Sequence, residues 1–378
     1  MPFEYLVAVW DGKRRLLGVM RQAEAAFPDA INFADLLKER FPFLWRDTLQ
    51  RVQDAFCALI EQRTTNQQQW SQAMPGTSSP EAKKKRLGRC IQDPQLDRNF
   101  FLSFLISLLP AGKLVLSLDR TNWEHGDTPL NLLVLGVVLE GFTLPLVWVA
   151  LDHGGCSDSA TRERLVARLL ESLPAQRWKA LVADREFVGK QWFTFLRKRK
   201  IRRVIRIRAD SVVDELRVDQ WFGDVQIGKK RCLFEKGWVY GCVMQVVATR
   251  AADGDLIVLA TDLKVWDTWT VYRLRWSIEC TFSSMKSRGF DLERSAVTHA
   301  DRLERLFGLV TLAWVCCLRV GVWMNASKPI PVKAHGRRAV SVVQYGWQYL
   351  ARALRWDHPQ AELYFGLLNQ PFSASSAT

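Results

Sequence analysis

Two aspartates close apolar segments that have the composition of buried strands. Asp119 ends the segment KLVLSLD, and Asp184 ends WKALVAD. If these strands are parallel neighbours, their ends meet at one edge of the sheet, and the two carboxylates repel each other unless a cation lies between them. Mg²⁺ suits that position because it is a hard ion held by carboxylates and substrate phosphate. Alternatively, each aspartate caps the loop or helix that follows it.

A third carboxylate lies in a segment of helical periodicity, residues 270–288. At about 100° per residue, one stripe roughly 60° wide holds four polar residues: Tyr272, Arg275, Glu279 and Lys286. Trp276 lies at the edge of this stripe, and apolar residues form a separate one. An acid flanked by basic residues suits a metal ligand beside phosphate-binding cations, and with the two aspartates it would complete a two-metal site for phosphoryl transfer. The alternative is a surface helix with an Arg275–Glu279 ion pair.

The elements that must position these residues follow from hydrophobic patterning after Pro110. We expect three strands, a helix, a strand, a helix and a fifth strand, which together form a mixed sheet with helices packed on it. Residues 209–270 are turn-rich and strand-like, with a hairpin turn at 252–254, and predict a β-rich insertion. A long buried helix is expected over residues 301–324.

The flanking parts of the chain are predicted to be helical. Residues 1–31 carry no clear pattern beyond a short helix, residues 32–97 have helical periodicity, and the last fifty or so also look helical before a polar tail, SASSAT. These patterns predict three parts of the chain: an N-terminal helical domain (1–110), a mixed-sheet domain (111–325) and a C-terminal helical segment with its tail (326–378).

Charge and composition indicate the class of partner. The net charge is +14, the hydrophobic fraction 48% and the charged fraction 24%, which fits a folded chain whose partner is a polyanion. Two clusters are the most basic. One opens at Ser79-Pro80 and contains Lys83, Lys84, Lys85, Arg86 and Arg89; the other is RKRKIRRVIRIR (197–208), which includes Arg206 and Arg208. We expect both to contact DNA, although the first could simply be a solvated helix face and the second a strand edge.

Other classes are disfavoured. No run of about 18 uncharged apolar residues is present and the N-terminus lacks the order of a signal peptide, so we expect a cytoplasmic protein without a membrane span. Eight cysteines without a CxxC motif favour reduced thiols over disulfides or zinc.

Four ordered blocks resemble the IS4 family of DDE transposases. Tyr272, Arg275, Glu279 and Lys286 match its Y-x2-R-x3-E-x6-K signature. LDRTNW (118–123) and ADREFVG (183–189) resemble the segments that hold its two aspartates, and RLERLFGLVTLAWVCCLRVG (302–321) resembles the helix that follows. The likeness extends over roughly residues 32–325, and the DRTNW, DREF and YREK motifs are Tn5-like.

The resemblance implies a fold, an activity and a set of roles. It implies an α/β, RNase H-like catalytic domain with a β-rich insertion, preceded by a helical DNA-binding domain. It implies two Mg²⁺ ions, with Mn²⁺ able to replace them, held by Asp119, Asp184 and Glu279. Tyr272, Arg275 and Lys286 would hold phosphates near the terminal nucleotide, and Trp276 matches a tryptophan of Tn5-like members.

The implied reaction is cut-and-paste transposition. DNA would be nicked at the terminal inverted repeats, and a 3′-hydroxyl would then attack target DNA, with the protein acting as a homodimer in a synaptic complex, nucleoid-associated in a bacterium. In Tn5-like members a tryptophan of the insertion helps to hold a flipped base. Here an aliphatic run (256–259) stands in its place, with Trp238 and Trp266 as loose substitutes. The resemblance therefore implies cleavage more directly than a hairpin intermediate.

Two other functions are compatible with the same residues. A DNA-binding protein without catalysis, such as an inhibitor derived from a transposase, would bind DNA without nicking it. A structure-specific nuclease on the same fold would cut without requiring terminal repeats and would not join a 3′-hydroxyl to a target. The retention of all three acids, Asp119, Asp184 and Glu279, argues against the first.

Overall fold

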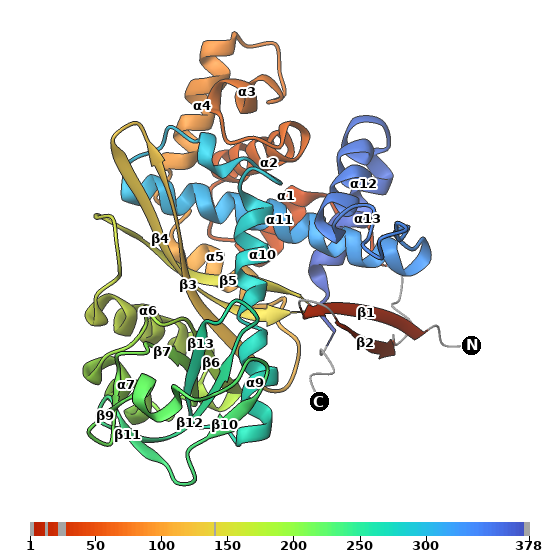
Figure 1. Cartoon of the computed structure of the whole chain (residues 1–378). Coiled ribbons are helices and arrows are strands. Elements are labelled where there is room, and N and C mark those ends of the chain that lie inside the picture. Colours follow the sequence, from red (N-terminus) through yellow and green to blue (C-terminus); the bar gives the residue numbers. More distant parts are fainter. Residues whose placement is uncertain (1–3, 12–13, 22–27, 140, 374–378) are drawn as a thin grey trace. The chain divides into compact units, whose positions relative to one another are not determined.

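The computed structural model describes residues 4–11, 14–21, 28–139 and 141–373 (Figure 1). The chain divides into two compact units, one comprising Met1–Pro110 with Ser283–Thr378 and the other Ala111–Phe282. The change of pattern after Pro110 coincides with the first boundary. The long C-terminal helix groups with the N-terminal helices in the first unit, whereas the sequence patterns assigned residues 111–325 to one domain. The tail from residue 374 lies outside the described residues.

The first unit is mainly helical but begins with a two-stranded ribbon. Its elements are β1 (Glu4–Asp11), β2 (Arg14–Arg21), α1 (Phe33–Arg40), α2 (Arg46–Gln62), α3 (Gln67–Gln72), α4 (Pro80–Gln92), α5 (Arg98–Ile106), η2 (Leu292–Arg294), α11 (Ala300–Ser327), α12 (Val342–Trp356), α13 (His358–Gly366) and η3 (Leu367–Asn369). Among the residues before 32 that the structure describes, the expected short helix is not found, and β1 and β2 pair there as antiparallel strands. The start of α4 is as predicted, since the Ser79 hydroxyl accepts from the Ala82 N–H and proline occupies the first turn.

Helix α11 is the centre of this unit. It is long and apolar enough to cross a membrane, but its most apolar stretch is 89% buried inside the molecule, as in the core helix of a folded domain. Helix α12 packs closely on it because Gly346 lies against the backbone of α11, where a Cβ would overlap the Cys317 carbonyl oxygen. The buried Glu304 of α11 accepts hydrogen bonds from Nε and Nη2 of Arg98 on α5.

The second unit contains an 11-stranded mixed sheet. Its elements are β3 (Leu114–His125), β4 (Thr128–Leu139), β5 (Phe142–Leu151), α6 (Ser159–Ser172), η1 (Ala175–Arg177), β6 (Trp178–Ala183), α7 (Lys190–Lys198), β7 (Arg203–Ile207), β8 (Val212–Val213), β9 (Leu216–Arg217), α8 (Val218–Phe222), β10 (Lys230–Cys232), β11 (Gly237–Val239), β12 (Cys242–Arg250), β13 (Leu256–Thr261), α9 (Val265–Arg273) and α10 (Trp276–Met285), the last of which runs past the boundary. The strand order is β5-β4-β3-β6-β7-β13-β12-β11-β8-β9, with β10 paired to β12.

This topology confirms the predicted order of strands and helices and the mixed α/β class. Strands β3, β6 and β7 are parallel neighbours, and the remaining pairs are antiparallel. The segment 209–270 is β-rich as expected, with its hairpin turn between β12 and β13. It does not form a separate sheet, however, because β13 pairs with β7 and so extends the central sheet. Figure 1 shows α6 and α7 on one side of the central strands and α9 on the other.

Candidate active site

The register of β3 against β6 brings the two aspartates together. Leu118 pairs with Ala183, so Asp119 and Asp184 are the next residues on two parallel neighbours. Strand β6 ends immediately before Asp184, as predicted. Strand β3 does not end at Asp119, which corrects the sequence-based expectation: it continues to His125 because β4 pairs with it along that whole length.

Both aspartates project from the sheet face that α9 covers. Val115, Val182 and Val204 of the three parallel strands pack in one apolar cluster with Val271 of α9. Because side chains alternate between the faces of a strand, Asp119, four residues after Val115, and Asp184, two after Val182, fall on that same face. Helix α9 thus places its last turn over the carboxylates.

The helical segment is not one straight helix. Helix α9 ends at Arg273 and α10 begins at Trp276, and between them the Arg275 N–H donates to the Tyr272 carbonyl at 2.9 Å and the Ile278 N–H to the Arg275 carbonyl at 3.1 Å. These i to i+3 bonds tighten the backbone, so the single stripe expected from a uniform 100° rotation is wrong in detail.

Helix α10 is fixed to the sheet by hydroxyl groups that sequence reasoning missed. The Thr281 hydroxyl accepts from the Thr143 N–H and donates to the Thr143 carbonyl, both at 2.9 Å, and the hydroxyls of Thr143 and Ser277 are 2.7 Å apart. All three residues are buried. The sequence signal for these bonds was the pair Ser277 and Thr281, two hydroxyl residues four positions apart on an otherwise apolar helix face. These bonds hold the turn of α10 that carries Glu279 against β5.

Arg275 joins two of the three predicted acids. Its guanidinium lies 3.4 Å from Asp119 Oδ2 and 2.6 Å from Glu279 Oε1. The third acid, Asp184, accepts a long hydrogen bond from the Tyr272 hydroxyl at 3.5 Å. The arginine–glutamate pair considered as a surface alternative therefore forms, but on a side chain that is only 15% exposed and that also contacts Asp119. Glu279 is thereby linked through Arg275 to Asp119 on β3.

The electrostatics of the site follow from burial and from this concentration of acids. Burial raises the pKa of Asp119 to about 7; the Arg120 N–H and Arg275 oppose the rise, and Glu186 and Glu279 add to it. Burial likewise raises the pKa of Tyr272 to about 12, with the charge of Asp184 contributing, so its hydroxyl stays a neutral donor. For Arg275 burial lowers the pKa, but Tyr272 and the three acids outweigh it and the net shift is upward.

The donor set suits a divalent cation with oxygen ligands. Asp119, Asp184 and Glu279 offer only carboxylate oxygens, and Arg275 supplies the positive charge that these acids share. Within the described residues, no three His, Cys, Asp or Glu side chains are close enough together to hold a metal as they stand. The residues therefore fit Mg²⁺ by chemical type, while their present partner is the guanidinium.

A fourth carboxylate supports the site. Arg120 Nε lies 2.8 and 2.9 Å from the two carboxylate oxygens of Glu186. Each of the two side chains is 20% exposed. Arg120 follows Asp119 and Glu186 lies two residues after Asp184, so this ion pair ties the two strand ends together. The pair is placed to orient the aspartates beside it.

An open groove of about 490 Å³ lies next to the second aspartate. It is lined by Arg185, Glu186, Arg208, Ala209, Asp210 and Arg217. Sequence analysis had placed Arg208 among the DNA-contacting residues but had not grouped it with Arg185 or Arg217, which come from separate loops and strands. The groove carries three arginines against two acids, Glu186 and Asp210, so its lining has a small excess of positive charge beside Asp184.

The other predicted DNA-binding residues are dispersed. Arg206 pairs with Asp255 at 2.5 Å, and Arg203 of the same strip is buried against Asp262, so residues 197–208 do not present one continuous basic face. Strand β7 within this strip is buried along nearly its whole length. In the first unit, Lys286 pairs with Glu293 at 3.1 Å.

The lysine cluster of α4 keeps most of its charge at the surface. Lys84 and Lys85 are exposed and Lys83 is half-buried. Arg86 instead contacts Asp54 at 3.3 Å and donates to the Pro75 carbonyl, so it braces the helix rather than facing solvent. Trp276, at the start of α10, is 62% exposed and can offer a face to a ligand.

Comparisons with known proteins agree with this site. Residues 110–316, more than half of the chain, match the family model described as the transposase DDE domain. No curated protein matches the sequence. Among solved structures, the chain is similar to a piggyBac transposase in its synaptic complex with hairpin DNA (11% identity, 86% of this chain and 76% of that one, TM-score 0.46). It is also similar to endonuclease V of Bacillus subtilis (10% identity, 57% and 91%, TM-score 0.26).

The residues that match the family model include all the residues of the candidate active site. They include both strand ends, Asp119 and Asp184, the joint between α9 and α10, and Glu279. Members of this class cleave DNA and transfer strands with the help of divalent metal ions. The chain belongs to the transposase DDE domain family.

Proposed function

We propose that this protein is an IS4-family transposase that binds the terminal inverted repeats of an insertion sequence and moves the element by cutting and pasting. The observation that carries the proposal is the contact of one guanidinium with Asp119 and Glu279, beside Asp184 at the adjoining strand end. A binding module has no need to place two acids against one mostly buried arginine with a third acid at the adjoining strand end, because uncompensated buried charge is costly.

Asp119, Asp184 and Glu279 would hold the metal, as two Mg²⁺ ions or Mn²⁺ in their place. The chemistry supplied by such ions is activation of the attacking oxygen and stabilisation of the leaving oxygen in an in-line displacement at phosphorus. The raised pKa of Asp119 supports this role, because a carboxylate that burial destabilises gains from a cation close to it.

The remaining side chains of the motif would position DNA. Arg275 keeps further N–H donors for a phosphate, and its planar fork suits bidentate binding, whereas Lys286 would act as a point charge. The Tyr272 hydroxyl, neutral at working pH, would donate to a phosphate oxygen. Trp276 is exposed and would stack near the terminal nucleotide. The groove with Arg185, Arg208 and Arg217 would accept the adjoining backbone.

The wider assignment follows from the same resemblance. Residues 1–110 would bind the repeats through α4, residues 111–325 would carry catalysis, and residues 326–378 would complete the helical part. The protein would act as a homodimer that synapses two double-stranded transposon ends with target DNA, in the cytoplasm of a bacterium and on its nucleoid when bound. Strand cleavage by the two-metal route would precede attack by the DNA 3′-hydroxyl.

The test is a strand-transfer assay with purified protein, Mg²⁺ and labelled duplexes that carry the repeats flanking this gene. The proposal predicts labelled ends joined to a target plasmid, with no joining for duplexes in which the repeats are scrambled. Cleavage of both duplexes without joining would instead indicate a structure-specific nuclease. A mobility shift without any nicking would indicate a binding protein that lacks catalysis.

A further inference from the structure

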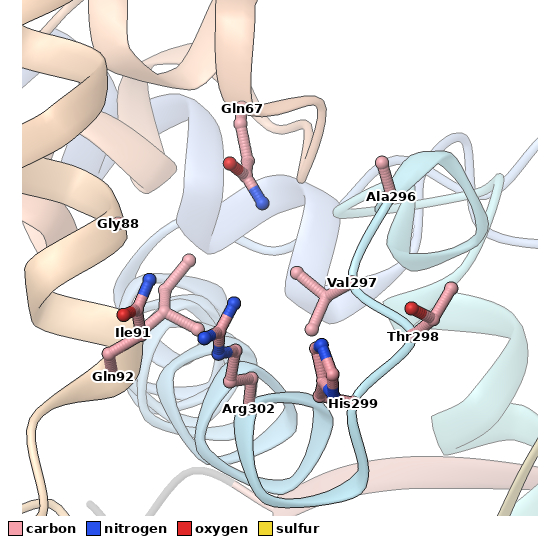
Figure 2. A pocket seen from close by; sticks show the side chains of 9 residues that line it. All are labelled: Gln67, Gly88, Ile91, Gln92, Ala296, Val297, Thr298, His299 and Arg302. Atoms are coloured by element: carbon pink, nitrogen blue, oxygen red, sulfur yellow. The ribbon is translucent and has the colours of Figure 1, made fainter.

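A cavity in the helical unit lies outside the site described above. It has a volume of about 110 Å³ and lies among α3, α4 and the segment that leads into α11, all of which belong to the same unit (Figure 2). Its lining is Gln67, Gly88, Ile91, Gln92, Ala296, Val297, Thr298, His299 and Arg302. Figure 2 shows the polar ends of Gln67, Arg302 and His299 directed from different segments toward one opening.

The lining chemistry favours an anion. The polar groups are two amides, a hydroxyl, an imidazole and the guanidinium of Arg302, and none of the residues that line this cavity is acidic. Arg302 is half-buried, and within the described part of the chain no ion pair is formed by it. A guanidinium that is withdrawn from bulk water without an acid partner is matched best by a phosphate or carboxylate oxygen.

Gly88 supplies a second, independent observation. It lies in the interior of the 13-residue helix α4, where glycine is less favourable than alanine. A Cβ added there would meet only Gln92 Nε2, at 3.8 Å, which is ordinary contact, so packing inside the protein does not require glycine. The missing side chain instead leaves the cavity wall open and lets a ligand approach the helix backbone.

The same helix carries exposed positive charge next to the cavity. Lys84 and Lys85 precede Gly88 by four and three residues, about one turn along α4, and Arg89 follows it. All three side chains are exposed. The cavity therefore opens from a surface on which several phosphates, spaced as in a nucleic acid backbone, would each find a cation.

We propose that this cavity binds one phosphate of a DNA backbone, with Arg302 as its charged ligand and Gly88 giving access, while Lys84, Lys85 and Arg89 contact flanking phosphates. The inference rests on the proposed function in that DNA is the partner. It adds a phosphate site made by residues of α3, α4 and α11, away from the carboxylates of the catalytic centre.

The test measures duplex binding by full-length protein as a function of salt, using fluorescence anisotropy. Arg302→Gln is expected to weaken binding about tenfold and to reduce the slope of log affinity against log salt by about 1, the change for one lost phosphate contact. Gly88→Ala is expected to weaken binding roughly threefold or more while leaving the midpoint of thermal unfolding equal or higher, since alanine is the better helix former. Arg352→Gln, an exposed charge change on α12, is the matched control.

The outcomes separate this site from the function it rests on. Wild-type affinity and slope in both Arg302→Gln and Gly88→Ala, with DNA still cleaved, would overturn the phosphate site and leave the proposed function standing. Failure of the wild-type protein to bind any duplex would overturn both. Thermal stabilisation by millimolar inorganic phosphate that requires Arg302, with duplex binding unchanged in the variant, would show a site for a free anion and also reject the proposal.

Discussion

Arg275 has more partners than any other side chain of the catalytic centre. It contacts Asp119 and Glu279, its guanidinium lies 6.0 Å from the centre of the Tyr272 ring, and burial leaves it 15% exposed. Removing it would leave Asp119 without its nearest positive charge. Because the carboxylates repel one another, the pKa of Asp119 would then rise further and its ionised form would become scarcer at neutral pH.

We therefore expect Arg275→Gln to reduce DNA cleavage by about 100-fold or more, the typical cost of one donor removed from a preorganised site. Arg275→Lys should recover only part of the activity, because an ammonium cannot bridge two acids with a planar fork. Single-turnover cleavage of an end-labelled duplex measures the effect. The control is Arg164→Gln, an exposed arginine of α6 in the same unit. Equal rates for Arg275→Gln and the control would show that the bridge is not needed for catalysis.

At the scale of elements, the joint between α9 and α10 determines where Glu279 lies. Thr281 satisfies both backbone groups of Thr143, so Thr281→Val keeps the shape but leaves a buried N–H and a buried carbonyl without partners. We expect the free energy of unfolding to fall by about 1–3 kcal/mol and cleavage to fall with it. Urea denaturation measures the first effect. Ser287→Ala, at an exposed position just beyond α10, should change neither quantity; a Thr281→Val variant as stable as that control would contradict the anchoring role.

The sequence predicted this region in part. The apolar runs ending in Asp119 and Asp184 predicted two buried strands, because continuous apolar runs are typical of such strands; that the strands are parallel neighbours was an assumption, which the pairing of β3 with β6 supports. The break between α9 and α10 was not predictable, since residues 273–276 carry no proline or glycine, and its local i to i+3 bonds lie between side chains that make long-range contacts to β3 and β5. The extent of β3 depended on its pairing with β4, and the hairpin β1–β2 had no alternation strong enough to reveal it.

The β-rich insertion, residues 209–270, also contains contacts that local sequence patterns do not predict. Its strand content and the turn at 252–254 follow from local sequence, whereas the pairing of β13 with β7 is a long-range contact that no local pattern specifies. The basic strip 197–208 appeared uniform in sequence, but β7 is buried along nearly its whole length, and Arg203 pairs there with Asp262. Charge density along a chain therefore predicted a partner class better than it predicted which side chains reach that partner.

At the scale of the whole molecule, the exposure and the pKa of the cysteines can be used to test how the core is packed. None of the eight is in a disulfide, as expected; Cys156 and Cys232 are exposed. Cys90 and Cys317 are fully buried, and burial raises the pKa of each from 9.0 to about 12. In the native protein they are therefore thiols across the physiological range, and they become thiolates only when the chain unfolds.

This difference makes stability depend on pH in one direction. Because the folded pKa lies above the unfolded value, the contribution of Cys90 and Cys317 is complete below about pH 9 and is lost as the pH rises toward 12. Each thiol adds a slope of up to about 1.4 kcal/mol per pH unit in that window. Urea unfolding at pH 8 and 10.5 measures it, and Cys317→Ala should show a shallower decline. An equal decline in this variant would contradict the assignment.

Native thiol labelling provides a kinetic check on the same fold. We expect an aromatic disulfide reagent to modify Cys156 and Cys232 within minutes at pH 8, and Cys90, Cys316 and Cys317 only after denaturation, because the thiolate is the reactive form and requires access. Mass spectrometry of peptides after a timed quench identifies the sites. Rapid modification of Cys316 or Cys317 in the native protein would be inconsistent with α11 as the core helix of its unit.

The central claim is that Asp119, Asp184 and Glu279 act as one catalytic centre on DNA. Its most direct test is the rate of Mg²⁺-dependent nicking at the ends of a duplex that carries the element's own repeats, measured for the wild type and for Asp119→Asn, Asp184→Asn and Glu279→Gln. Glu171→Gln, an exposed acid of α6, serves as the control. We predict that each of the three substitutions abolishes nicking while duplex binding and the control remain at wild-type levels. Nicking at the wild-type rate by any one of the three would contradict the account.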